Sequence, residues 1–542
     1  MTEIRFFRNR FGMVFISGLW ILVGSCVSFQ TGPMETESSR PVYIAEDLTP
    51  KSEIKMEKAP SVTIPSEGPI RITIRDAILL ALENNRSLVV ERLNPAIQQT
   101  FEDQERAVFD PATEAEISAQ RTDSMRQATT GSGTESSVSD AYQGSISLGE
   151  FFPTGTTVGV EGINRTTESS LYRDPFSSTR FGLSVTQALL RGYGTDVNLV
   201  RLRQAKLETH ISQYELRGFS EALLSQVENA YWDYALAQRQ IEIVEESLKI
   251  AQQQLAETEE MIRVGKMAEA ELAAAQAEVA LQQQGRINAK SSLESTRLQL
   301  LRLLNPPVGN LWGRDLSLIH QPTLPEVKLD DVQSHVAVAL RMRPDINQAK
   351  LGIQQGDLEI VRTKNGLLPR MDLFITLGKT GYADSFASSV SDITEDSYDV
   401  LGGLSFQYPI RNRDAEARHR RALLRRDQEE KALANLSQLV ELDVRNAYIE
   451  VNRAKEQITA SSATRKLQEE KLRIETEKFR VGRSTNFLVA QAQRDLLVSR
   501  IAEVQSLANY LKALVNLYRQ EGSLLERRGV SAPGRKPVEP FS

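Results

Sequence analysis

The sequence contains little of what builds enzyme centres, disulfides or aromatic cores. Cys26 is the only cysteine among 542 residues, so no intramolecular disulfide can form. Only 6% of residues are aromatic, while Ala, Leu, Gln, Glu and Arg abound, as in proteins built of long helices. We find no nucleophile–base set, metal-ligand spacing or phosphate loop, and predict no catalytic centre, no cofactor and no metal site. The four histidines are too scattered for a metal site: His210, His320, His335 and His419.

Strong net charge and long apolar runs are also missing. The formal net charge is −6, which is too mild to indicate nucleic acid or a polybasic membrane anchor. After the first 26 residues no stretch approaches the roughly 20 apolar residues that a membrane helix needs. If the mature protein spans a membrane, it must therefore do so with strands.

The N-terminus has the pattern of an export signal. Three arginines precede an apolar run over 11–23, and Gly24-Ser25-Cys26 closes it. The run is too short for a spanning helix, so residues 1–25 are predicted to be a signal peptide. The ending at Leu22–Cys26 resembles a bacterial lipoprotein cleavage box, which makes Cys26 a candidate for lipidation. The alternative is an ordinary signal peptide with an incidental cysteine.

The chain is duplicated. Val227-Glu228-Asn229-Ala230-Tyr231 recurs as Val444-Arg445-Asn446-Ala447-Tyr448, and Arg263-Val264-Gly265-Lys266 recurs as Arg480-Val481-Gly482-Arg483, both at a separation of 217 positions. Two matches at one separation indicate an internal repeat. The predicted organisation is a tether at 26–69, a first repeat at 70–305 with strands within 111–190, a bridging segment at 306–331, a second repeat at 332–525 with strands within 369–410, and a disordered tail at 526–542.

Each repeat is predicted to contain one very long helix between two shorter ones. The long helices, about 196–262 and 413–480, would be rods of roughly 100 Å. The short helices, about 76–108 with 268–304 and 332–367 with 486–521, could stack end to end beside them. Apolar residues in the first long helix follow a coiled-coil spacing of fours and threes, from Val227 through Tyr234 and Val244 to Leu255. A simple antiparallel bundle is the alternative. Such thin helices would complete their packing against further copies.

The strand regions show period-two alternation. In the second repeat Met371, Leu373, Ile375 and Leu377 alternate with other residues, as in a strand with one apolar face. One chain offers about four such strands, too few to close a barrel, whereas three copies would offer about twelve. An additional hairpin is predicted near 144–165, and the sequence does not decide whether it joins the membrane strands.

The ordered motifs resemble the TolC family of outer-membrane efflux and secretion proteins, over about residues 70–525. They are Asp76-Ala77 with Ala81 to Asn85, Phe109-Asp110-Pro111, Leu183 to Leu190, Arg343-Pro344-Asp345, Phe406 to Ile410 and both Val-Gly tips. The sequence departs from the family at Ala188, where proline is usual. The resemblance implies a mainly helical fold with membrane strands: a homotrimer whose coiled-coil helices form an α-barrel in the periplasm below a trimeric β-barrel in the outer membrane of a diderm bacterium.

The resemblance also assigns candidate site residues. Its helical tips dock a periplasmic adaptor (membrane fusion protein), and the positions here are Arg263, Val264, Gly265, Lys266, Arg480, Val481, Gly482 and Arg483. The alternative is that each glycine only ends its helix. An entrance gate would combine Glu271 with Leu488, unless Glu271 is an ordinary surface residue.

The predicted function is therefore a channel that passes small molecules outward. Its predicted partners are the adaptor, an inner-membrane RND or ABC transporter and outer-membrane lipid, and nucleic acid is not expected as a partner. Two alternatives remain: the duct of a type I protein secretion system, and a periplasmic coiled-coil scaffold without a pore.

Overall fold

The computed structural model describes residues 55–56, 68–127, 130–170, 174–307, 312–319, 323–324, 328–394 and 397–539. The predicted signal peptide at 1–25 and Cys26 lie outside these residues. All described residues belong to one compact unit that runs from Pro50 to Ser542.

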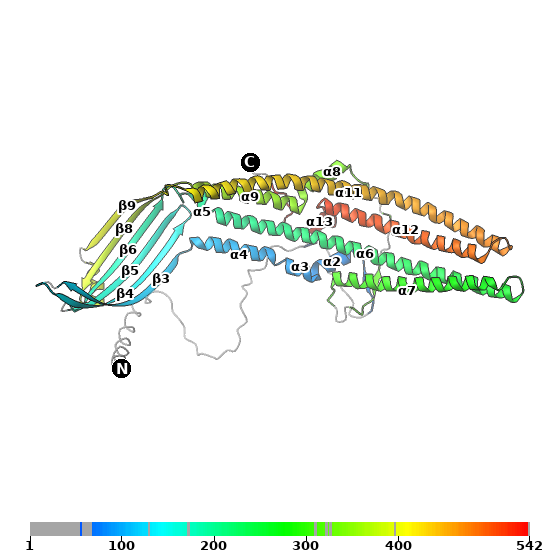
Figure 1. Ribbon diagram of the computed structural model, residues 1–542, viewed down its shortest axis with the longest axis horizontal. Helices are drawn as coiled ribbons and strands as arrows, with labels where there is room; N and C mark the ends of the chain where they lie inside the picture. The colour runs from blue at the N-terminus through cyan, green and yellow to red at the C-terminus, as the bar shows by residue number, and fades with distance from the viewer. Residues whose placement is uncertain are drawn as a thin grey trace, which may run out of the picture. The chain divides into compact units, whose positions relative to one another are not determined.

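Two long helices dominate this unit. They are α6 (Val200–Arg263) and α11 (Arg413–Arg480), and each has two shorter helices in series beside it (Figure 1). The partners of α6 are α4 (Asn94–Arg106) and α7 (Ala270–Leu304), and those of α11 are α9 (Pro344–Asn365) and α12 (Asn486–Gln520). The predicted stacking is thus confirmed. Of the helices in the described part of the chain, none is both long and apolar enough to cross a membrane.

The first helix of each repeat is broken, so the prediction of continuous helices over 76–108 and 332–367 is wrong. The first consists of α2 (Ile74–Asn84), α3 (Arg86–Glu91) and α4, and the second of α8 (Val332–Met342) and α9. Asn85 causes one break, because its side chain accepts hydrogen bonds from the amides of Ser87 and Leu88 and starts a new helix. Pro344 causes the other, because the residue before proline is driven out of the helical conformation.

A six-stranded antiparallel sheet lies at one end of the long helices (Figure 1). Its order is β3-β4-β5-β6-β8-β9, with bounds Ala112–Gln127, Thr134–Phe152, Thr156–Ser169, Phe176–Ala188, Arg370–Ala383 and Tyr398–Gln407. The predicted count of about four strands per chain is too low, because the hairpin near 144–165 forms β4 and β5 within the same sheet. A short helix, α10 (Phe386–Ser391), packs on β6 and β8.

Two short sheets join distant parts of the chain. Strand β2 (Ile70–Ile72) pairs in parallel with β7 (Leu316–Leu318), so the bridging segment returns to the start of the first repeat. Strand β1 (Lys55–Met56) pairs with β10 (Val530–Ser531), which places a piece of the predicted tether beside the end of the chain.

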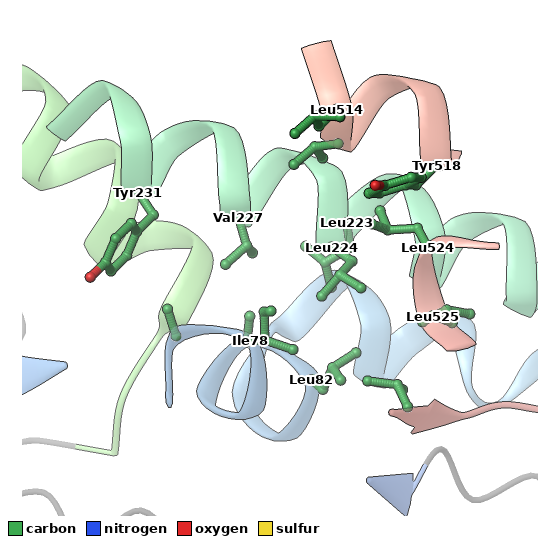
Figure 2. Close-up of a cluster of buried hydrophobic side chains, with 14 of the residues drawn as sticks. Ile78, Leu82, Leu223, Leu224, Val227, Tyr231, Leu514, Tyr518, Leu524 and Leu525 are labelled. Carbon is green, nitrogen blue, oxygen red and sulfur yellow. The ribbon is translucent and has the colours of Figure 1, made fainter. Parts of the chain in front are cut away.

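The main core lies midway along the helices, where both repeats meet. Ile78 and Leu82 of α2, Leu224 of α6 and Leu514 of α12 are buried together there, with Leu525 of α13 (Leu524–Arg527) (Figure 2). Burying one such side chain stabilises a fold by about 1.5–3 kcal/mol. Further along α6, most of the predicted apolar positions that follow Val227 are buried as well.

Beside this core lies a buried charge cluster. The Arg217 guanidinium is fully buried and bonds to the Glu526 carboxylate at 2.7 Å, to the Gly522 carbonyl at 3.1 Å and to Glu221 at 3.2 Å. Burial raises the pKa of Glu221 to about 8, although the nearby Arg217 opposes the change. A second buried pair links the His335 ring to the Glu521 carboxylate.

The tail is ordered as far as the structure describes it, up to residue 539, so the prediction of disorder from 526 is wrong. Val530 and Ala532 are buried, and Arg528 makes two hydrogen bonds of 2.7 Å to the buried Glu228 carboxylate. The amide of Val538 bonds to Asn347 of α9. The polar composition of the tail suggested disorder, but Arg528 bonds to α6, Val530 pairs with Met56 of β1, and the backbone amide of Val538 bonds to α9.

Candidate functional site

The two tips, defined as 263–266 and 480–483, have the same backbone structure. At the first tip the amide of Gly265 donates to Ile262 O and that of Lys266 to Met261 O, both at 2.9 Å. At the second tip Gly482 donates to Phe479 O at 2.9 Å and Arg483 to Lys478 O at 2.8 Å. This pair of bonds is the Schellman motif, which satisfies the last carbonyls of a helix.

Glycine is required at both tips for conformational reasons. Gly265 has φ 73° and Gly482 has φ 72°, in the left-handed region that glycine adopts at little cost. No described atom lies within 4 Å of the place that a Cβ would take at either residue. The tip glycines therefore set the turn and do not make room for a neighbour within this chain.

The tips present apolar and basic side chains at the end of the helices that is distant from the sheet (Figure 1). Val264 is 53% exposed and Val481 69% exposed. The two repeats thus expose a valine at the same position of equivalent turns. Lys266 and Arg483 are exposed as well.

The arginines of the tips are partly neutralised within their own helices. Arg263 bonds to Glu260 at 2.5 Å, and Arg480 bonds to Glu477 at 3.1 Å. Exposed ion pairs of this kind add little stability, but they lower the field that the arginines present outward. The basic character of the tips therefore depends mainly on Lys266 and Arg483.

Glu271 joins the two repeats near the tips. Its carboxylate accepts a hydrogen bond of 3.1 Å from the backbone amide of Asn486, the first residue of α12. An amide at a helix N-terminus has no partner within the helix and favours an anion. Leu488 lies two residues further along α12 and is 43% exposed.

Sequence reasoning missed Asn486, which is the centre of this contact. Its buried side chain donates to the Thr258 hydroxyl at 3.0 Å and accepts from Gln254 at 3.1 Å. Thr258 interrupts the apolar spacing of α6, and that interruption is the one signal of a buried polar partner. A second polar link lies deeper, where Arg494 of α12 bonds to the buried Glu278 of α7 at 3.1 Å.

One face of the sheet is apolar at one level of the strands β4, β5, β6, β8 and β9. In the register, Leu148 of β4 lies opposite Val160 of β5, Val160 opposite Leu183 of β6, Leu183 opposite Leu377 of β8, and Leu377 opposite Val400 of β9. We call these five residues the apolar row. Each is at least 39% exposed in the single chain. The row is the kind of surface that lipid or another protein covers.

At the same level the other face carries polar residues and glycines. We define the polar row as Ser147, Glu161, Gly182, Gly378 and Asp399. Each of these residues is the immediate sequence neighbour of a residue in the apolar row, and they lie opposite one another on adjacent strands. Alternate residues of a strand point to opposite faces, so the two rows lie on opposite sides at one level. A sheet with one apolar and one polar face separates lipid from water.

Comparison with known families decides the assignment. The profile of the outer membrane efflux protein family matches residues 77–306 and 336–523, which is most of the chain. The chain is a member of the outer membrane efflux protein family. The predicted TolC-family resemblance and the outer-membrane location are confirmed, and the apolar row belongs to an outer-membrane channel protein.

Solved structures of outer-membrane channels share this fold. The efflux protein is 18% identical to OprN, with a TM-score of 0.61, over 83% of this chain and 90% of that one. It is 15% identical to CmeC of Campylobacter jejuni, with a TM-score of 0.63, over 91% and 94%. It is 18% identical to the open state of MtrE of Neisseria gonorrhoeae, with a TM-score of 0.58, over 87% and 98%. No curated protein matches by sequence.

Proposed function

We propose that this efflux protein is the outer-membrane channel of a tripartite system that passes small molecules from the periplasm to the exterior. In this proposal three copies assemble, their strands face outer-membrane lipid, and their tips meet a periplasmic adaptor. An inner-membrane RND or ABC transporter supplies the energy. The chain itself acts as the duct and not as an enzyme.

The sheet carries the proposal. Its apolar row is exposed in the single chain, and within the described residues β3 and β9 each have a strand neighbour on one side only. An open sheet edge in lipid leaves backbone groups without hydrogen bonds, at a cost of several kcal/mol for each group. Further copies of the chain remove that cost by continuing the sheet. A periplasmic scaffold would have no use for an exposed apolar face.

The tips are proposed to dock the adaptor. Val264 and Val481 are exposed at equivalent turns, so each chain offers the same small surface twice. A photo-reactive amino acid at either position should crosslink the adaptor in cells. Leu424 is a matched control, because it is exposed on α11 and lies far along that helix from the tip. Equal crosslinking at Leu424 and at the tips would contradict docking at the tips.

Glu271 and Leu488 are proposed to belong to the entrance gate. The bond from Glu271 to the Asn486 amide holds α7 against α12, and both helices begin just beyond a tip. Opening of the entrance would separate these helices and break the bond.

Lipidation of Cys26 is a further part of the proposal and concerns a residue outside the described structure. Mass spectrometry of the N-terminal peptide of the purified protein should find a lipid-modified Cys26 as the first residue. An unmodified peptide that retains Cys26 would contradict it.

Bilayer recording tests the core of the proposal. Purified protein should form ion-conducting pores in planar bilayers, and its mass in detergent, after subtraction of bound detergent, should be close to that of three mature chains. A water-soluble monomer without channel activity would overturn the proposal.

Deletion of the gene separates efflux from secretion. Cells without the protein should accumulate a fluorescent efflux substrate, while their set of secreted proteins stays unchanged. The opposite result, loss of a secreted protein without dye accumulation, would favour the type I secretion duct.

A further inference from the structure

The strand number of the sheet has a consequence for the pore. The duplication of the chain predicts two strands from each repeat. In the structure these four strands are β3 and β6 of the first repeat and β8 and β9 of the second. The hairpin of β4 and β5 lies between β3 and β6, and it pairs with both along most of its length. The hairpin is therefore an integral part of the sheet and not a loop attached to it.

The hairpin continues both faces of the sheet. It contributes Leu148 and Val160 to the apolar row and Ser147 and Glu161 to the polar row. A one-residue slip would exchange the two faces, so this register is the one that suits a sheet between lipid and water. The hairpin thus lies at the same level as the strands of the two repeats.

An ion-pair network ties the hairpin to the second repeat. Arg180 of β6 bonds to Glu161 of β5 at 3.1 Å and to Asp399 of β9 at 2.6 Å. Its guanidinium reaches across β8 above Gly378, where a Cβ would lie 2.6 Å from the Arg180 Nη2 atom. Because Gly378 has no side chain, the Arg180 guanidinium has room above β8 to bond to β5 on one side and to β9 on the other.

The two edges of the sheet are complementary. Strand β3 leaves the helical end of the sheet after α4, and β9 returns to that end before α11. The number of strands is even, so β9 of one copy and β3 of the next run in opposite directions, as do all neighbours within the sheet. On the apolar face these edges present Ile117 and Leu404, which are 72% and 65% exposed.

The circumference of the helical part fits the larger sheet. Four helices lie side by side next to the sheet, namely α4, α6, α9 and α11, so three copies place 3 × 4 = 12 helices in a ring. At interaxial distances of 8–10 Å, the ring measures roughly 96–120 Å. Strands about 4.8 Å apart and tilted by about 40° each occupy about 6.3 Å of a ring. Eighteen strands need about 113 Å, whereas twelve need about 75 Å.

We propose that three copies close a barrel of 3 × 6 = 18 strands, which makes the membrane pore about one and a half times as wide as a twelve-stranded one. The proposal rests on the trimeric channel of the previous section. On the polar face the hairpin adds small residues, among them Ser145, Ser147, Gly149, Thr157 and Gly159, and larger ones, among them Phe151, Glu161 and Ile163. The added strands increase the circumference of the barrel, so the pore admits bulkier solutes than a twelve-stranded barrel would.

Cysteine labelling in the membrane tests whether the hairpin is part of the barrel wall. In Leu148→Cys the thiol should react with a lipid-confined maleimide, and in Ser147→Cys with a water-soluble one. The matched control is Leu377→Cys with Thr376→Cys, adjacent residues on opposite faces of a strand from the second repeat. Wild-type protein gives the background from Cys26.

Each outcome has a clear meaning. The same alternation in both pairs, together with eighteen strands in a density map of the trimer, supports the wide barrel. Alternation in the control pair with water-soluble labelling of both hairpin residues, or a ring of twelve strands with the hairpin outside it, overturns the wide barrel and leaves the channel intact. No alternation in either pair contradicts membrane insertion and thus the proposed function itself.

Discussion

The carboxylate of Glu271 on α7 accepts a hydrogen bond of 3.1 Å from the backbone amide of Asn486 on α12. Glu271→Ala removes this link between the repeats, so we expect a larger mean conductance in planar bilayers and weaker preference for cations. Glu259→Ala is the control, because it removes the same charge from an exposed position on α6. A Glu271→Ala channel that behaves as the wild type would exclude Glu271 from the gate.

Charge reversal at the tips should weaken binding of the adaptor unequally. Arg263 and Arg480 are partly neutralised by glutamates of their own helices, whereas Lys266 and Arg483 lie beyond the helix ends and are exposed. Lys266→Glu with Arg483→Glu should therefore reduce adaptor crosslinking more than Arg263→Glu with Arg480→Glu. Crosslinking that survives all four reversals would show that the charges of the tips play no part in docking.

Alanine at a tip glycine should destabilise the turn locally. At φ 73° the change Gly265→Ala should cost about 1–2 kcal/mol, since a Cβ disfavours the left-handed conformation. Faster hydrogen exchange at the Lys266 amide measures the loss. Gly285→Ala is the matched control within α7, where the added Cβ would meet Val244 at an ordinary 3.6 Å and should stabilise the helix by up to about 1 kcal/mol. Equal exchange in both variants would be inconsistent with this role for the tip.

Glu221 should make stability depend on pH. Burial raises its pKa to about 8 in the folded protein, from an ordinary value of 4.5. The folded state thus holds the proton more tightly than the unfolded state, so this contribution is fully present below pH 4.5 and is lost as the pH rises through about 8. The melting temperature should fall between about pH 4.5 and pH 8 and level off above that range.

Glu221→Gln should flatten this dependence, because glutamine carries no proton to lose. Glu245→Gln, an exposed change on the same helix, should leave the slope of the wild type unchanged. If the Glu221→Gln protein loses stability over this range as steeply as the wild type, the pH dependence arises elsewhere.

The long helices and the tips were predictable because the chain repeats them. The start and end of α11 agree with the predicted 413–480, and both tips follow from the recurring Arg-Val-Gly sequence. The breaks at Asn85 and Pro344 could have been predicted too, since a capping side chain and a proline are local signals.

The contacts between the repeats were beyond sequence reasoning. Nothing in the local sequence links Glu271 to Asn486 or Arg528 to Glu228, because each pair is formed only when distant helices pack. Strand β4 was difficult for another reason. Its serines and glycines have weak strand propensity, and pairing with β3 and β5 outweighs that preference.

The hairpin of β4 and β5 enters and leaves the sheet from the end that is distant from the helices, while its own turn at Pro153 lies beside the start of α6. Inserting such a hairpin leaves the direction of every later strand, and the path into every later helix, as it was before. In the proposed barrel, one hairpin per chain therefore changes the circumference of the strand ring while the connections to the helices stay the same.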